Sequence, residues 1–252
     1  MKAYYLLILF LVNTSIVFSQ RSEADEVQTS NGKLTIQPVL HSTLVLSWNN
    51  KTLFIDPYGG IKAFAGISGP DLIIITDIHG DHMNIETLTA LDTERAVIVA
   101  PKAVVDQLPE ILKMKAKSLS NGGILEESGV KITALPMYNL PETEDSRHPK
   151  GRGNGYVLTF GNTTVYISGD TEDIPEMRSL KNIDIAFVCM NQPFTMTIEQ
   201  AASAVLEFKP KIVYPFHYRG QGGFSDVETF RKLIESGNNK IEVRLRNWYP
   251  TY

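Results

Sequence analysis

The sequence has a single cysteine among 252 residues, Cys189, and this scarcity excludes an intramolecular disulfide. The fold must therefore be held by its apolar core, to which 43% hydrophobic residues contribute. Cys189 itself lies in the apolar run "IDIAFVCM", so we expect a buried structural thiol rather than a reactive one.

The chain also lacks a strong excess of charge of either sign. It has 24 Lys and Arg against 28 Asp and Glu, which gives a formal net charge of -4 and no electrostatic footprint for nucleic acid. It has no nucleophile elbow, Walker loop or dinucleotide fingerprint. A small-molecule or lipid-like substrate is the partner that we expect, and its identity is not encoded in these motifs.

A long apolar run is missing except at the N-terminus. Residues 1–19, "MKAYYLLILFLVNTSIVFS", combine one early lysine with an apolar stretch from Ala3 to Val12 and a small residue, Ser19, at the end. This pattern is typical of a cleaved secretory signal peptide. The alternative is a membrane anchor, but the stretch is short for a span and polar residues at 13–15 interrupt it. We therefore predict cleavage after Ser19, no membrane span in the mature chain, and a secreted or periplasmic location.

The rest of the chain predicts one layered α/β domain. Residues 20–32 are polar and acidic and are expected to form a flexible leader, and residues 33–252 form the domain. A β-rich stretch followed by alternating strands and helices occurs twice, which favours two packed sheets with helices on their outer faces. The pattern predicts a hairpin at Asn49-Asn50, a helix over residues 101–114, and capping boxes at Thr197/Gln200 and Ser225/Glu228.

Ionisable residues gather at the ends of predicted strands. The buried-looking strand "DLIIIT" is followed by "DIHGDH", an Asp-x-His-x-Asp-His cluster. Packing so many ionisable groups at the end of a buried strand is costly unless a cation compensates them. Three further residues stand in or just after strand-to-loop transitions: His148, Asp170 and His217. Together with the cluster they favour a metal site at one rim of the sheets.

These motifs resemble those of the metallo-β-lactamase fold superfamily. The resemblance rests on "TDIHGDH", His148, "ISGDT" and "PFHY", and covers residues 33–250. The opening hairpin "HSTLVLSWNNKTLFIDPY" is similar to the branch that contains L-ascorbate-6-phosphate lactonase and the N-acyl-phosphatidylethanolamine-hydrolysing phospholipase D. The resemblance implies a four-layer αββα sandwich and a hydrolase in which two metal ions activate water to cleave an ester, lactone or phosphodiester. Zinc is the expected metal.

The resemblance also implies a role for each ligand. The first metal would be held by Asp77, His79 and His148. The second would be held by Asp81, His82 and His217. Asp170 would bridge the two, Asp81 or Asp170 would move the proton, and Asp56 would support the site.

Asp77 departs from the family pattern, which has a histidine at this position. A carboxylate oxygen is a legitimate zinc ligand and suits manganese or iron better. Two divalent ions carry four positive charges, and Asp77, Asp81, Asp170 and a hydroxide carry four negative ones, so we expect Asp77 to be retained as a ligand. The alternative is a weak first site.

Several residues remain open between function and structure. His41 would line the site or make a structural hydrogen bond, and Arg152 in "KGRGNG" would meet an anionic substrate or lie in a loop. Tyr138 and Tyr218 would polarise a substrate oxygen or pack, and Glu172 would support the site. A non-catalytic metal-binding protein of the same fold and a di-iron redox protein are the alternatives to the hydrolase.

Overall fold

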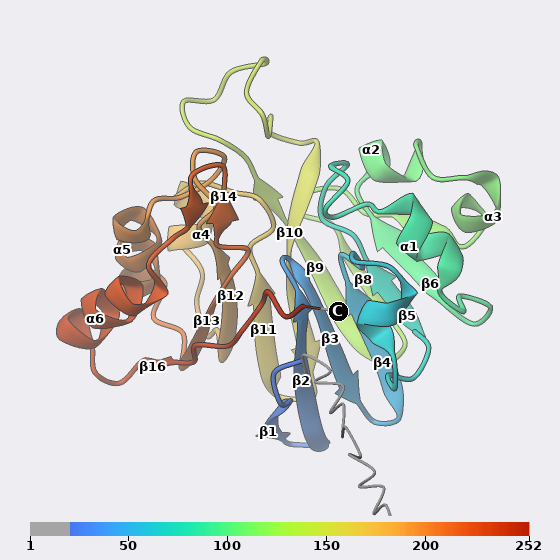
Figure 1. Ribbon diagram of the computed structural model, residues 1–252, viewed down its shortest axis with the longest axis horizontal. Helices are drawn as coiled ribbons and strands as arrows, with labels where there is room; N and C mark the ends of the chain where they lie inside the picture. The colour runs from blue at the N-terminus through green and yellow to red at the C-terminus, as the bar shows by residue number, and fades with distance from the viewer. Residues whose placement is uncertain (1–20, 252) are drawn as a thin grey trace, which may run out of the picture.

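The computed structural model describes residues 21–251, which form two seven-stranded β-sheets packed face to face between two groups of helices (Figure 1). The first sheet has the order β1-β2-β3-β4-β5-β6-β7. Its strands are β1 (Asp25–Thr29), β2 (Gly32–Leu40), β3 (Thr43–Trp48), β4 (Lys51–Ile55), β5 (Leu72–Ile74), β6 (Val97–Ala100) and β7 (Ala116–Ser118).

The second sheet has the order β16-β13-β12-β11-β10-β9-β8. Its strands are β8 (Ile124–Glu127), β9 (Val130–Met137), β10 (Gly153–Phe160), β11 (Thr163–Ile167), β12 (Ile185–Cys189), β13 (Ile212–Phe216) and β16 (Glu242–Val243). A separate two-stranded ribbon consists of β14 (Arg219–Gly220) and β15 (Gly223–Phe224).

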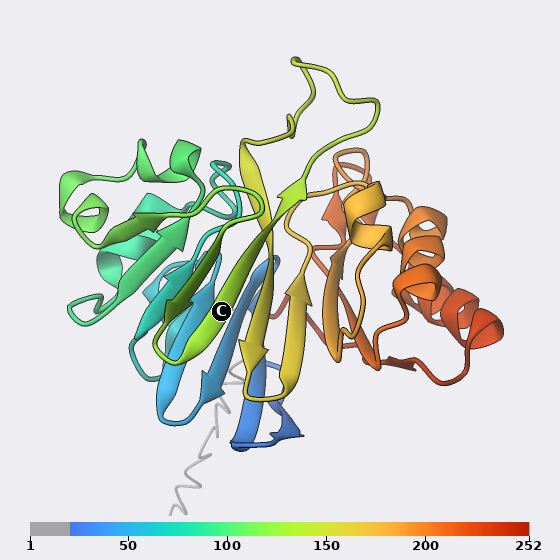
Figure 2. The ribbon, with the colours of Figure 1, turned by 180° about the vertical axis from the view of Figure 1, so that it is seen from behind.

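The helices flank the two sheets on opposite sides, as the views from the front and from behind show (Figures 1 and 2). Beside the first sheet lie η1 (Ile61–Phe64), α1 (Ile85–Ala90), α2 (Lys102–Val105) and α3 (Glu110–Lys113). Beside the second lie α4 (Pro175–Arg178), α5 (Ile198–Phe208) and α6 (Val227–Gly237). The predicted four-layer αββα sandwich is therefore confirmed.

Local sequence signals explain several element boundaries. Asn49 and Asn50 have φ angles of 49° and 58°, which suits the tight turn between β3 and β4. The capping box predicted at Thr197 and Gln200 begins α5. The second predicted box is wrong, because Asp226 rather than Ser225 caps α6 through hydrogen bonds from two backbone N–H groups. The single helix predicted over residues 101–114 is also wrong, because Pro109, which cannot donate a backbone hydrogen bond, begins a second short helix there.

The predicted flexible leader is wrong over residues 25–29, which form β1 and pair with β2. The acidic composition of this segment does not indicate that one of its carboxylates, that of Asp25, has specific hydrogen-bond partners. Asp25 accepts hydrogen bonds from Arg246 at 2.6 and 2.9 Å and from the Tyr214 hydroxyl at 2.9 Å. Ser22 also exchanges hydrogen bonds with the backbone of Asn247. The signal peptide predicted over residues 1–19 lies outside the described residues.

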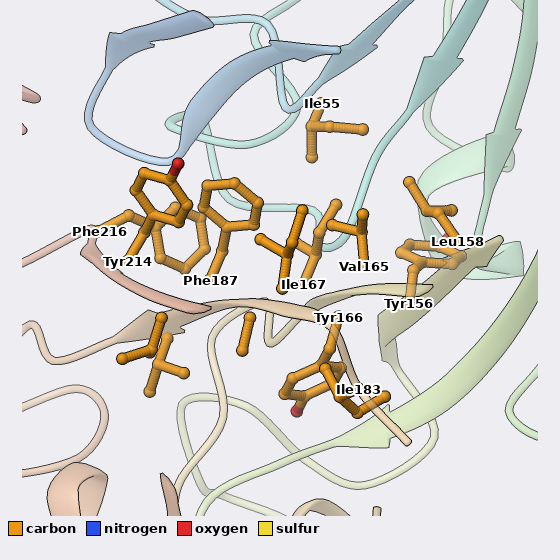
Figure 3. Packing of buried hydrophobic residues seen from close by; sticks show 14 of the residues in the cluster. Ile55, Tyr156, Leu158, Val165, Tyr166, Ile167, Ile183, Phe187, Tyr214 and Phe216 are labelled. Atoms are coloured by element: carbon orange, nitrogen blue, oxygen red, sulfur yellow. The ribbon is translucent and has the colours of Figure 1, made fainter. Parts of the chain in front are cut away.

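One layer of the core lies between the sheets (Figure 3), and further buried residues join each sheet to its helices. Ile55 of the first sheet faces a layer that includes Ile167 and Phe187 of the second, and Phe187 stacks on Tyr214 with ring centroids 4.8 Å apart. Removing a buried ring of this kind costs about 3–5 kcal/mol. Cys189 is fully buried, as predicted. No helix among residues 21–251 is long and apolar enough to cross a membrane.

Candidate metal centre

The ionisable residues that the first sheet contributes lie in one short segment after β5. Strand β5 is wholly buried, and the chain after it turns sharply, because the backbone N–H of His82 donates to the carbonyl of His79 at 2.9 Å. Asn84 then caps α1. This turn directs the side chains of residues 77–82 to one end of the sandwich.

The second sheet supplies single residues from separate segments. His148 comes from the β9–β10 loop, Asp170 follows β11, and His217 follows β13. Their side chains approach those of the first segment, although up to 140 residues separate them along the chain (217 − 77 = 140). The structure thus brings together all seven predicted ligands: Asp77, His79, Asp81, His82, His148, Asp170 and His217.

The first ligand group consists of Asp77, His79 and His148, whose ligand atoms lie within 4.8 Å of one another. Nδ1 of His79 lies 2.8 Å from Oδ2 of Asp77. The ring of His148 is oriented by Asn139, whose Oδ1 lies 3.1 Å from Nδ1 and accepts the backbone N–H at 2.7 Å. With Nδ1 donating to this amide oxygen, Nε2 of His148 carries a lone pair toward the group.

The second ligand group consists of His82, Asp170 and His217. The Nε2 atoms of the two histidines lie 3.2 Å apart, and each is 3.2–3.3 Å from an oxygen of Asp170. Nδ1 of His82 lies 2.7 Å from Oδ2 of Asp56, and Asp56 also accepts the N–H and hydroxyl of Thr76. A carboxylate behind a ligating histidine fixes the ring and strengthens its donor nitrogen.

Asp170 joins the two groups. Its Oδ2 lies 3.2 Å from Nε2 of His148 and 3.3 Å from Nε2 of His82, and its Oδ1 lies 3.2 Å from Nε2 of His217. This placement supports the bridging role that the resemblance implied.

Asp81 lies nearest to His41, whose role the sequence left open. Its Oδ2 is 3.2 Å from Nε2 of His41, 3.5 Å from Nε2 of His217, while its Oδ1 is 3.9 Å from Nε2 of His82. His41, Asp81 and His217 form a third possible ligand set. The Tyr249 hydroxyl lies 2.9 Å from Nδ1 of His41. His41 therefore belongs to the site.

Arg152 also belongs to the site, but not as the sequence suggested. Its Nε donates to Oδ1 of Asp77 at 3.1 Å and its Nη2 to Oδ2 at 2.9 Å. The guanidinium thus meets a buried carboxylate of the protein rather than an open substrate pocket.

Buried carboxylates and imidazoles lie in direct contact in the cluster, and each shifts the pKa of its neighbours. Burial alone would raise the pKa of Asp170, but His217 and His82 outweigh it and hold the pKa well below its usual range. Burial would lower the pKa of His82, but Asp170, Asp56 and Asp81 raise it well above its usual value. The pKa of His41 falls to about 4, first because of burial and then because of His217.

The donor set fits a cation. Among the described residues, buried atoms without a hydrogen-bond partner include Nδ1 of His79, Nε2 of His148 and Oδ1 of Asp170. An unpaired buried polar atom costs about 1–3 kcal/mol, so three of them within the two ligand groups are unfavourable without a bound partner. Imidazole nitrogens and carboxylate oxygens are the ligands that zinc and neighbouring divalent metals take.

Two supporting residues carry no recognisable signal in the sequence. Asn139 lies in an ordinary loop segment and Thr76 at the end of an apolar strand, and neither type is diagnostic there. Three residues of the site, His41, Asp56 and His217, have φ angles of 60°, 44° and 45°. Non-glycine residues held in this left-handed region cluster at functional sites. The remaining candidates lie outside the ligand groups: the Tyr138 hydroxyl donates to Glu176, the Tyr218 hydroxyl to the Arg246 carbonyl, and Glu172 accepts from Asn139.

Known proteins share this architecture. A family model described as the beta-lactamase superfamily domain matches residues 35–217, so the chain belongs to that superfamily. The fold and the site thus define a protein of the metallo-β-lactamase class.

Its relatives make the assignment narrower. A UPF0173 metal-dependent hydrolase of Thermococcus onnurineus is 33% identical over 203 residues, which cover 77% of this chain and 88% of that protein. A crystal structure described as a metal-dependent hydrolase from Parabacteroides distasonis is 38% identical, with a TM-score of 0.79, and covers 89% of this chain and 98% of that one. A metallo hydrolase of Ignicoccus hospitalis, 21% identical with a TM-score of 0.71 over 87% of this chain and 96% of its own, supports the fold. The predicted class, a metal-dependent hydrolase of this superfamily, is confirmed at that level, which favours it over the non-catalytic and redox alternatives.

Proposed function

We propose that the protein is a hydrolase with two divalent metal ions, most plausibly zinc, that cleaves an ester, lactone or phosphodiester. Asp77, His79 and His148 would hold one ion, Asp81, His82 and His217 the other, and Asp170 would bridge them. Manganese or iron is the alternative because Asp77 adds a hard oxygen ligand. The observation that carries the proposal is that Asp170 contacts histidines of both ligand groups, in which buried nitrogen and oxygen atoms lack hydrogen-bond partners.

Two ions bound there would acidify a water molecule and polarise the scissile carbonyl or phosphoryl group. The chain itself supplies the proton acceptor. Both Asp81 and Asp170 line the pocket, but the side chain of Asp81 is 33% exposed, whereas that of Asp170 is 4% exposed. Asp81 is therefore the better placed of the two to accept the proton of the attacking water and pass it to the leaving group. His41 holds Asp81 in position at 3.2 Å.

The pocket at the centre favours a substrate with an anionic group. It has a volume of about 400 Å³, and its lining includes Asp81, His217, Arg147 and Arg219. The guanidinium carbon of Arg147 lies 4.3 Å from the ring centroid of Phe194, and that of Arg219 lies 4.9 Å from the ring centroid of Tyr249. Neither guanidinium forms an ion pair with another residue of the described chain. Stacked, unpaired guanidinium groups are suited to carboxylate or phosphate recognition.

Metal content and substrate choice test the proposal together. Protein purified without chelator and then reconstituted should contain close to two metal equivalents by elemental analysis, and loading that stops at about one equivalent or below would overturn the dinuclear centre. Turnover should then be compared on a neutral nitrophenyl ester, the same ester with a terminal carboxylate, and a nitrophenyl phosphodiester.

Arginine variants provide the control for the anionic group. Arg147→Met and Arg219→Met should each raise KM for the charged substrates about tenfold, because a hydrogen bond to a charged group contributes about 1.5–3 kcal/mol. Cleavage of the neutral ester should be unchanged. An equal effect on neutral and charged substrates would contradict the anionic preference while leaving the hydrolase assignment intact.

We also propose that the protein is exported. The support is the signal-like sequence of residues 1–19, and the test is cell fractionation of the full-length chain beside a version without these residues. Recovery of both in the cytoplasm would refute export.

A further inference from the structure

Asp77 forms an ion pair with Arg152, which directly precedes β10 of the second sheet. The carboxylate is fully buried, and each of its oxygens accepts one hydrogen bond from Arg152, at 3.1 and 2.9 Å. Two parallel hydrogen bonds fix the plane of a carboxylate and are stronger than neutral ones. The Arg152 side chain is only 20% exposed, so water screens the pair weakly.

The backbone positions Arg152 for this contact. A Cβ atom on the next residue, Gly153, would lie 2.9 Å from the carbonyl oxygen of Thr76, so the start of β10 can approach the end of β5 only because this residue is glycine. One residue further, the Asn154 N–H donates to the same carbonyl at 2.9 Å. The arginine is therefore held beside Asp77 by rigid strand ends rather than by a free loop.

Arg152 leaves part of Asp77 available. A carboxylate has about four lone-pair positions, and the arginine uses one on each oxygen. Oδ2 also lies 2.8 Å from Nδ1 of His79, and Nδ1 has no hydrogen-bond partner among the described residues. Arg152 thus occupies one position on each oxygen of Asp77, while Oδ2 also lies beside another donor atom of the first ligand group.

The charges suggest why the pair exists. The carboxylates of Asp77, Asp81 and Asp170 and one hydroxide give four negative charges against the four positive charges of two divalent ions. The positive charge of Arg152 changes this balance to a net charge of +1. A centre with neutral histidine at position 77 and no arginine has the same net charge, because it loses one negative and one positive charge together.

We propose that Asp77 and Arg152 act as one unit that takes the place of the neutral histidine found in related centres. Arg152 is then a positioning residue that cancels the charge of Asp77 and aims its oxygen. This inference rests on the proposed function in one respect, namely that the first ligand group binds a metal ion.

The unit makes a counterintuitive prediction for Asp77→His. This substitution supplies the family's usual ligand, yet it leaves the guanidinium of Arg152 largely buried, unpaired and close to two cations. Breaking a buried ion pair on one side is strongly unfavourable. The first metal should therefore bind more weakly, and removing the charge of Arg152 as well should restore binding.

The experiment is a double-mutant cycle read out as metal affinity. Zinc and cobalt affinities of wild type, Asp77→His, Arg152→Met and the double variant are measured by chelator competition, and the cobalt absorption spectrum reports the ligands. Asp77→His should bind the first metal at least about tenfold more weakly, the scale on which supporting partners of metal ligands act. The double variant should return to within about threefold of wild type.

Lys150→Met is the matched control. Lys150 lies two residues from Arg152 and faces Glu142 and Glu176 rather than the ligand groups. Combined with Asp77→His, it should give no recovery. Arg152→Lys tests the pair without altering Asp77: it keeps the charge but loses the fork, and should weaken the first metal while leaving the second unchanged.

Two results separate this proposal from the proposed function. Wild type that binds two metals, with Asp77→His binding them as tightly whether or not Arg152 is present, would overturn the unit and leave the dinuclear centre intact. Wild type that cannot be loaded beyond one equivalent would overturn the dinuclear centre and the unit with it.

Discussion

The two ligand groups of the candidate metal centre are built with opposite arrangements of charge. In the first group a carboxylate, Asp77, faces the other donors and a cation, Arg152, lies behind it. In the second group an imidazole, His82, faces the other donors and a carboxylate, Asp56, lies behind it. Each group contains a buried carboxylate and a basic side chain, but their order relative to the centre is reversed.

This reversal indicates that each supporting residue offsets the charge or donor strength of the ligand that it contacts. A carboxylate behind an imidazole makes its nitrogen a stronger donor, whereas an arginine behind a carboxylate makes its oxygen a weaker one. We therefore expect the second group to hold its metal more tightly and the first group to release its metal earlier during titration with a chelator.

The largest effect should come from the residue that the two groups share. Asp170→Ala should abolish the binding of both metals. It should also reduce turnover at least about 10³-fold, the scale seen when a catalytic unit is lost. Asp77→Ala should reduce only the first metal, because Asp77 contacts one group. Metal content and turnover are measured in both variants. An Asp170 variant with two metals and near-normal turnover would remove the bridge from the comparison.

A second variant should weaken metal binding by the second group alone. Asp56→Ala removes the acceptor of Nδ1 of His82 and of the N–H and hydroxyl of Thr76. The second metal should bind about 10–100-fold more weakly, and unfolding should become easier by about 1–3 kcal/mol for each donor left unpaired. Asp106→Ala, which removes an exposed ion pair with Lys102, is the control and should change neither quantity measurably. Equal loss from both groups would contradict their independence.

The matching change in the first group should have a smaller effect. Asn139→Ala removes the oxygen that orients His148 but leaves Asp77, Arg152 and His79 in place. We expect about a tenfold loss of affinity for the first metal and none for the second, measured by the same chelator competition. If the second metal is lost instead, His148 has been assigned to the wrong group.

The smallest effect is expected at Cys189, which checks that these losses are local. Burial, and then the charge of Asp170, raise the pKa of the Cys189 thiol to about 11. At pH 8 only about a thousandth of the thiol is ionised, so alkylation should be undetectable in wild type and in the Asn139 variant. The thiolate fraction should grow as the pH rises through about 11. Rapid labelling of a variant at pH 8 would mean that the substitution opened the core rather than one ligand group.

The part of the site that sequence predicted well is the part that is local in the chain. Residues 77–82 follow one buried strand, so their type and spacing can be read directly from the sequence, and together with three later residues they indicate a metal site. Asp170 and His217 are recognisable because each closely follows a strand, and strand ends meet in a layered sheet fold, whereas His148 lies within the β9–β10 loop.

The contacts between distant segments could not be predicted in the same way. Asp77 and Arg152 are 75 residues apart and come from different sheets, and an arginine in a glycine-rich loop is equally compatible with substrate binding. The pairing of Asp81 with His41 depends on the left-handed backbone at His41, which no residue pattern marks. The strand at residues 25–29 pairs with β2, but its first residue, Asp25, also binds Arg246 and Tyr214 near the other end of the described chain, and the acidic composition of the segment does not indicate these partners.

That last contact has a consequence for how the chain could be rearranged. Ser22 and Asn247 exchange hydrogen bonds, and Asp25 pairs with Arg246, so the two ends of the described chain lie side by side. The first sheet occupies the earlier part of the sequence and the second sheet the later part, with one connection between β7 and β8. A short linker across the ends would make the backbone a closed ring, and cutting it between β7 and β8 would give a circular permutant in which the sheets exchange their order. Folding of such a permutant with both ligand groups intact would show that the site does not depend on which sheet is synthesised first.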